Sequence, residues 1–174
     1  MGKSNITHNF NVDVEYANDK DISDWLNKAY HKKFPHLTNI EHIGDKDKRQ
    51  KLGIDKILYF ESKQLFIDEK IRREYYPDIL LEEYSVYEKK TVGWMGKKKH
   101  TDYIVYVKVP SREFYFLPFT LLQLAWLQNY KVWLEEYGRV FSNNEGYRTS
   151  NIPVPIKVLY NAMNECIYTK MDKG

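Results

Sequence analysis

The stretch Ile54–Ile71 reads IDKILYFESKQLFIDEKI, and it decides the predicted fold. Its two halves, Ile54–Phe60 and Leu65–Ile71, are rich in β-branched and aromatic residues, and the polar residues Glu61–Gln64 separate them. This pattern is typical of two antiparallel strands joined by a short turn. We therefore expect a β-hairpin at this point of the chain.

The hairpin is expected to carry Asp55, Asp68 and Lys70 on one face. If residues 62 and 63 form the turn, Asp55 lies opposite Lys70, and paired side chains share a face of the sheet. Glu69 falls on the other face and is therefore not chosen as a ligand. That face is otherwise apolar, with Ile54, Leu58, Phe60, Leu65, Ile67 and Ile71. A register shift of one residue would separate Asp55 from the other two polar side chains.

The other segments predict an α+β fold with a mostly antiparallel or mixed sheet. Helical spacing of apolar residues predicts a helix from Asp21 that ends before Pro35. Further strands are expected at residues 79–87, 103–109 and 113–117, helices at 119–137 and 156–168, a polar loop at 142–146 and an extended segment at 152–156.

The composition sets limits on the class of protein. The chain has 174 residues, a net charge of +3, one cysteine and no apolar run near the ~20 residues of a membrane span. A disulfide-stapled mini-protein is thereby excluded, and we expect one cytoplasmic domain over residues 1–174 with no membrane partner. Aromatic residues make up 16% of the chain, which mildly favours nucleic acid as a partner because such rings stack on bases.

The polar face of the hairpin has the residue types of a metal-dependent hydrolytic site. Asp55 and Asp68 offer the hard oxygen ligands that Mg²⁺ prefers, and Lys70 can orient water or neutralise developing charge. Of Glu82 and Glu83 on the next strand only one can join them, since neighbouring side chains face opposite ways. Ordinary surface charge is the alternative, but Asp68 and Lys70 interrupt an apolar run, where charges tend to be paired or coordinating.

These residues resemble the PD-(D/E)XK nuclease superfamily. The match starts from Gly53-Ile-Asp55 and Ile67-Asp-Glu-Lys70. Wider similarity to a group of phage and bacterial proteins with this core runs through Asp47-Lys-Arg-Gln50, Leu81-Glu-Glu-Tyr-Ser85, Gly93-Trp94 and Thr101-Asp-Tyr103. The resemblance covers about residues 13–109, and Ile54 stands where the family often has proline.

The resemblance implies a restriction-endonuclease-like core, with a central mixed sheet flanked by helices. It also implies hydrolysis of DNA phosphodiester bonds by water that Mg²⁺ or Mn²⁺ activates. Asp55, Asp68 and Lys70 match the catalytic positions, and Glu83 best matches the acid of the third strand as a further metal ligand. The family's acid on the opening helix has four candidates here: Glu15, Asp19, Asp21 and Asp24.

Five basic residues and the neutral Gln50, all near these motifs, are candidates for contacts with phosphate groups. They are Lys48, Arg49 and Gln50 before the first strand and Lys97, Lys98 and Lys99 between two later strands. Cutting both strands of DNA with one site per chain would require a homodimer. The alternative function is a catalytically inactive module on the same fold that binds nucleic acid or another protein.

Overall fold

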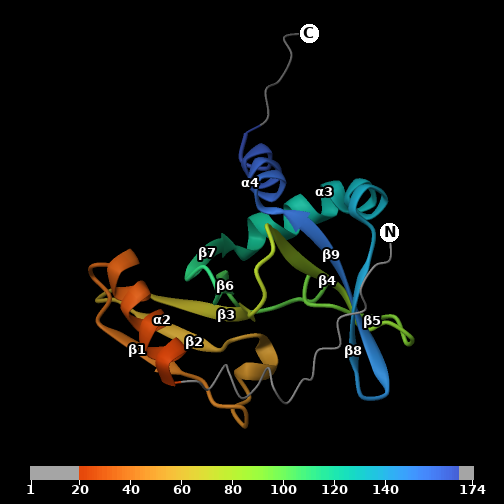
Figure 1. The fold of residues 1–174 in the computed structure, drawn as a ribbon. Helices are drawn as coiled ribbons and strands as arrows, with labels where there is room; N and C mark the ends of the chain where they lie inside the picture. Colours follow the sequence, from red (N-terminus) through yellow and green to blue (C-terminus); the bar gives the residue numbers. More distant parts are fainter. Residues whose placement is uncertain (1–19, 169–174) are drawn as a thin grey trace. The chain divides into compact units, whose positions relative to one another are not determined.

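The computed structural model describes residues 20–168, which divide into two compact units (Figure 1). The first, here called the β3 unit, comprises the described residues up to Tyr75 together with Lys98–Phe119. The second, the β4 unit, comprises Tyr76–Lys97 and the described residues from Thr120 on. The expectation of a single nuclease-like domain over residues 1–174 stays a prediction, and each unit is described by itself.

The β3 unit is built on a five-stranded mixed sheet. The order of its strands is β1-β2-β3-β6-β7, and only the pair β3–β6 is parallel. The elements are α2 (Lys20–Lys33), β1 (Asn39–His42), the 3₁₀ helix η1 (Gln50–Leu52), β2 (Lys56–Tyr59), β3 (Gln64–Arg72), β6 (Tyr103–Lys108) and β7 (Glu113–Pro118). The mixed sheet and its helix confirm the predicted α+β class.

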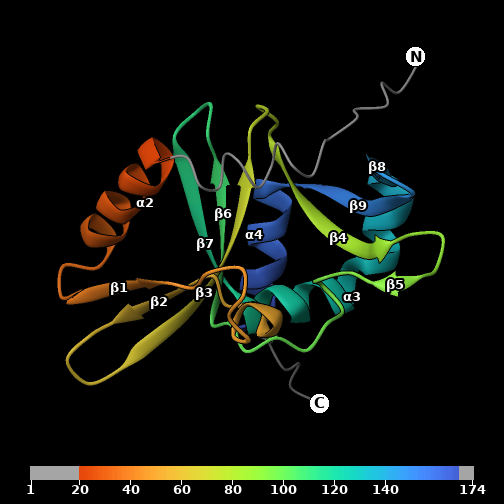
Figure 2. The same cartoon turned by 90° about the horizontal axis from the view of Figure 1, so that it is seen from below.

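Helix α2 covers one face of this sheet (Figure 2). Leu26 and Tyr30 of α2 are buried with Leu58 of β2, Ile67 of β3 and Val105 of β6. The helix ends at Lys33, two residues before Pro35, as predicted. Because side chains alternate along a strand, the neighbours of Ile67 on β3 project to the face opposite α2.

The register of the hairpin differs from the expected one by two residues. The Phe60 N–H donates to the carbonyl oxygen of Lys63 at 2.8 Å, so the turn is centred on residues 61 and 62. Lys56 therefore pairs with Ile67, and the next position places Asp55 across from Asp68 instead of Lys70. A shift of two keeps every strand residue on its predicted face, because the side-chain period is two.

Ile54 does not lie on the predicted apolar face. It precedes β2 and is buried in a separate cluster with Ile43 and Ile57. The alternation fails here because the chain turns at Gly53, whose φ of 78° is left-handed.

The β4 unit contains a second, four-stranded sheet of order β5-β4-β9-β8, in which every pair is antiparallel. Its elements are β4 (Asp78–Val86), β5 (Thr91–Val92), α3 (Phe119–Tyr137, of which Phe119 belongs to the β3 unit), β8 (Val140–Asn144), β9 (Tyr147–Pro155) and α4 (Ile156–Glu165). Helix α3 has the predicted bounds, while α4 ends three residues before the predicted end at residue 168. No helix within residues 20–168 combines the length and the apolarity that a bilayer span requires.

The prediction of a polar loop at residues 142–146 was wrong for residues 142–144 and correct for residues 145 and 146. Residues 142–144 belong to β8, which pairs with β9 through a tight turn at Glu145 and Gly146. Gly146 has a φ of 80°, a conformation that suits glycine in such turns. The strands β1 and β5 were not predicted either. These short or polar segments lack apolar alternation, and the backbone hydrogen bonds of a neighbouring strand hold them in place.

A buried ion pair lies on the α2 face of the sheet. The Lys56 ammonium lies 2.9 Å from Glu69 Oε1, and their side chains are only 5% and 10% exposed. The Tyr30 hydroxyl donates to the same carboxylate oxygen at 2.5 Å. Glu69 therefore serves the packing of this face, as its predicted orientation implied.

We predict that Glu69→Gln lowers the free energy of unfolding by about 3 kcal/mol. The variant leaves the buried Lys56 charge without its counter-charge, and breaking a buried pair in this way is costly. Urea denaturation followed by circular dichroism measures the loss. Glu61→Gln, at an exposed turn position, is the matched control and is expected to change stability by less than about 0.5 kcal/mol. Equal stability of the two variants would contradict the prediction.

Candidate active site

Backbone hydrogen bonds hold Asp55 against β3. Its own N–H donates to the carbonyl oxygen of Ile67 at 2.8 Å. Its carboxylate oxygen Oδ2 accepts a hydrogen bond from the N–H of Glu69, also at 2.8 Å. The side chain of Asp55 is therefore directed along β3 beside Asp68, although Asp55 itself precedes β2.

Asp68 is the centre of the cluster. It is 1% exposed, and its two carboxylate oxygens bind two different ammonium groups. Lys70, two residues further on the same face of β3, binds Oδ1, and Lys99 binds Oδ2. The structure thus brings together three residues that the sequence analysis placed on one face, and it adds Lys99.

The sequence analysis named Lys99 only as one of three lysines that could contact phosphate. Its side chain is 11% exposed, while Lys97 and Lys98 are exposed. The stem of Lys99 crosses Gly53, where a Cβ atom would lie 2.9 Å from Lys99 Cδ. The one sequence feature that relates to this contact is Gly53, directly before Ile54-Asp55. Lys99, which packs on it, lies 46 positions further along the chain.

The two carboxyl groups have opposite pKa shifts. Burial, followed by the negative charge of Asp68, raises the pKa of Asp55 to about 6, although Lys70 acts against this. Burial also acts to raise the pKa of Asp68, but the ammonium groups of Lys70 and Lys99 outweigh it and lower that pKa. Near neutral pH the site therefore holds two carboxylates close to two ammonium groups.

Glu83, which the resemblance implied as a further metal ligand, has protein partners of its own, and its role as a ligand stays a prediction. It lies in the β4 unit, at a bulge between the pairs Glu82–Asn151 and Tyr84–Ser150. Its carboxylate accepts hydrogen bonds from three side chains of that unit, Arg139, Tyr130 and Ser150. Burial alone would raise the pKa of Glu83, but these donors outweigh it and lower the pKa, so the carboxylate already has its counter-charge.

Glu82 is also engaged, since its side chain accepts a hydrogen bond from the N–H of Trp94 at 3.0 Å. The carboxylates of Glu82 and Glu83 therefore both have hydrogen-bond partners within the protein. We keep only Asp55 and Asp68 as the proposed donor pair.

The acid expected on the opening helix is not placed at the site. Glu15 and Asp19 lie outside the described residues. Asp21 and Asp24 are exposed on α2, which covers the sheet face opposite Asp68 and Lys70. The resemblance therefore does not extend to this position within the described part of the helix.

The predicted phosphate contacts fall into two groups. Arg49 binds the carboxylates of Asp47 and Glu41, each at 2.7 Å, so its charge is compensated within the protein. The amide of Gln50 donates to Asp45 at 3.2 Å. The residues with exposed ammonium groups are Lys48, Lys97 and Lys98.

A pair of carboxylates is a donor set typical of Mg²⁺, and it is too small for a metal ion that is bound by protein ligands alone. Within residues 20–168, no three His, Cys, Asp or Glu side chains come together as a metal-binding group. Mg²⁺ is commonly bound through one or two carboxylates, with water and substrate phosphate oxygens completing its octahedral shell. Asp55 and Asp68 fit that donor set.

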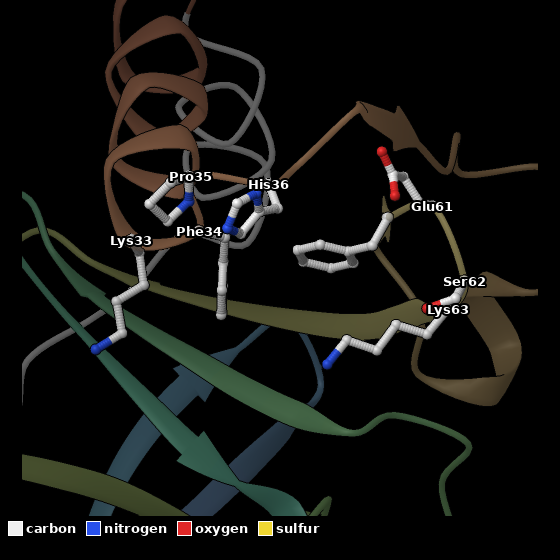
Figure 3. A pocket seen from close by; sticks show the side chains of 8 residues that line it. Lys33, Phe34, Pro35, His36, Glu61, Ser62 and Lys63 are labelled. Carbon is white, nitrogen blue, oxygen red and sulfur yellow. The ribbon is translucent and has the colours of Figure 1, made fainter.

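A separate cavity of about 360 Å³ lies at the other end of the hairpin (Figure 3). It is lined by Lys33, Phe34, Pro35, His36, Phe60, Glu61, Ser62 and Lys63. Phe60 follows β2 and Asp55 precedes it, so about five residues, or roughly 16 Å of extended chain, separate the cavity from the carboxylate pair. The cavity has one carboxylate in its lining and is separate from the cluster of Asp55 and Asp68.

Comparisons of the chain with protein-family models, with curated proteins and with solved structures found no match.

We predict that Asp55→Asn stabilises the protein at pH 8 and has little effect near pH 4. The folded protein keeps the Asp55 proton up to a pKa of about 6, whereas an unperturbed carboxyl group releases it near 3.8. Stability contributed by this group therefore falls as pH rises between those values, by about 3 kcal/mol in total. Asparagine cannot ionise, so the variant does not lose this stability.

Urea denaturation of both proteins at pH 4 and pH 8, with EDTA present, measures the difference. Asp24→Asn on the exposed face of α2 is the matched control. The same stability difference between parent and Asp55→Asn at both pH values would show that Asp55 is not perturbed.

Proposed function

We propose that this protein is a Mg²⁺-dependent nuclease that hydrolyses phosphodiester bonds of DNA. The observation that carries the proposal is the cluster of Asp55, Asp68 and Lys70 on the face of β3 opposite α2. A buried pair of acids, one with a pKa raised to about 6, costs stability. Groups with such shifts are frequent at functional sites, where their chemistry requires them.

Each residue of the cluster has a distinct task in this proposal. Asp55 and Asp68 hold Mg²⁺, or Mn²⁺ in its place, through their carboxylate oxygens. When bound, the ion supplies Lewis-acid stabilisation of phosphate charge and lowers the pKa of water. The Lys70 ammonium, whose side chain is 31% exposed, can donate to a phosphate oxygen or position the attacking water.

The proposed substrate follows from the exposed basic residues. Lys48, Lys97 and Lys98 can neutralise phosphate groups, and such contacts carry no base preference by themselves. A homodimer is part of the proposal only for cleavage of both strands, because each chain supplies one cluster. A cytoplasmic location remains the expectation from the sequence.

A specific observation favours a second candidate, an inactive module that binds nucleic acid or a protein. Glu83, which best matched the acid of the third strand, is paired with Arg139 and accepts hydrogen bonds from two hydroxyl groups. A module of this kind keeps the fold and the exposed lysines but does not cleave DNA. Cleavage and binding must therefore be measured separately.

Cleavage of supercoiled plasmid with Mg²⁺ or Mn²⁺ tests the nuclease proposal. We expect Asp68→Asn and Lys70→Ala each to lower the rate at least about 100-fold, because the first removes a carboxylate ligand of the metal ion and the second removes the ammonium group that acts on the phosphate or the water. Glu61→Gln, at the exposed turn of the same hairpin, is the matched control and is expected to cleave at the parent rate. Cleavage at equal rates by the parent and both site variants would point to a different site or to a contaminating enzyme.

Binding to a short DNA duplex in EDTA, measured at several salt concentrations, tests the basic residues. The triple variant Lys48→Gln, Lys97→Gln, Lys98→Gln is expected to bind more weakly at low salt. The slope of log affinity against log salt should also be shallower by up to about 3, close to 0.9 for each lost contact. An unchanged slope would show that DNA binds elsewhere on the protein.

A further inference from the structure

Both carboxylate oxygens of Asp68 already bind an ammonium group. Lys70 binds one of its oxygens and Lys99 binds the other, while Asp55 lies beside it. Two carboxylates and two ammonium groups make the cluster neutral. A divalent cation added to it would meet two like charges at short range, so its binding requires an ammonium group to leave Asp68.

The two lysines differ in how they are held. Lys70 lies in β3, paired with Tyr106 of β6, two residues from Asp68 on the same strand. Lys99 lies in the segment before β6, outside any strand, and reaches Asp68 from 31 positions away. Its stem rests on Gly53, which has no Cβ atom to block it. The ammonium group of Lys99 can therefore swing about its terminal bonds while the stem stays in place.

We propose that Lys99 is a second lysine of the active site, one that occupies the place of the metal ion. In the ion-free protein its ammonium holds Asp68 Oδ2. When Mg²⁺ binds Asp68, the ammonium moves to a phosphate oxygen of the nucleic acid. This inference rests on the proposed nuclease function and deepens it, since it makes metal binding and phosphate binding depend on each other.

The proposal separates Lys99 from a residue with a merely structural role. Removal of the Lys99 charge leaves Asp68 with one competitor fewer, so the metal ion binds more tightly. The same change deprives the substrate phosphate of a donor, so turnover falls. A structural lysine would, when removed, weaken metal binding and turnover together.

The experiment is calorimetric titration of Mn²⁺ alone into the parent, Lys99→Met and Lys98→Met, followed by plasmid cleavage by the parent and Lys99→Met at saturating Mn²⁺. Methionine keeps the apolar stem that packs on Gly53, and Lys98 is the exposed neighbour that serves as the matched control. We expect Lys99→Met to bind Mn²⁺ about 10-fold more tightly than the parent and to cleave at least 10-fold more slowly. Lys98→Met is expected to bind Mn²⁺ as the parent does.

The outcomes distinguish this inference from the proposed function. If the parent binds Mn²⁺ and cleaves, and Lys99→Met binds no more tightly than Lys98→Met, the inference is overturned and the nuclease proposal stands. If only Lys99→Met binds Mn²⁺, the inference is supported. If neither the parent nor Lys99→Met binds Mn²⁺ up to 10 mM and the parent does not cleave, the inference and the nuclease proposal are both overturned. Should Lys99→Met fail to fold by circular dichroism, Lys99→Gln, which keeps a neutral donor for Asp68, replaces it in the same titration.

Discussion

The pairing of β2 with β3 is the constraint on which the candidate site depends. Asp55 precedes β2 and Asp68 lies within β3. The Asp55 N–H donates to the carbonyl oxygen of Ile67, and the Glu69 N–H donates to the Asp55 carboxylate, so the two acids are held together. Because side chains alternate, the same pairing sends Glu69 to the other face, where it meets Lys56 and Tyr30. The strand thus carries a polar cluster on one face and a packed, charge-paired core on the other.

The cluster of Asp55, Asp68, Lys70 and Lys99 contains a carboxylate whose ionisation costs stability. Asp55 is buried beside a second carboxylate, and its pKa is raised to about 6 as a result. Two lysines stabilise Asp68, and the pKa of Lys99 is lowered, first by burial and then by the charge of Lys70. An apolar residue at position 55 would avoid this cost, and groups with such pKa shifts are frequent at functional sites.

The two acidic residues Asp68 and Glu83, both matched to metal ligands by the resemblance, have different surroundings within their own units. Asp68 binds the ammonium groups of two lysines, Lys70 and Lys99. Glu83 faces the guanidinium of Arg139, at 2.6 Å and 2.7 Å, and two hydroxyl groups. This fixed hydrogen-bonded geometry makes Glu83 part of the packing between β4, β9 and α3 and leaves the proposed donor pair with two members.

Local periodicity in the sequence was enough to place α2, the β2–β3 hairpin, β6, β7 and α3, and to put Asp55, Asp68 and Lys70 on one face. These properties depend on alternation along a strand or on helical spacing, which neighbouring residues determine. The register within the hairpin depended on a turn at residues 61 and 62, one position earlier than expected, and on its backbone hydrogen bond. Lys99 reached Asp68, and Arg139 reached Glu83, only through the path of the folded chain, because no local rule links residues 31 or 56 positions apart.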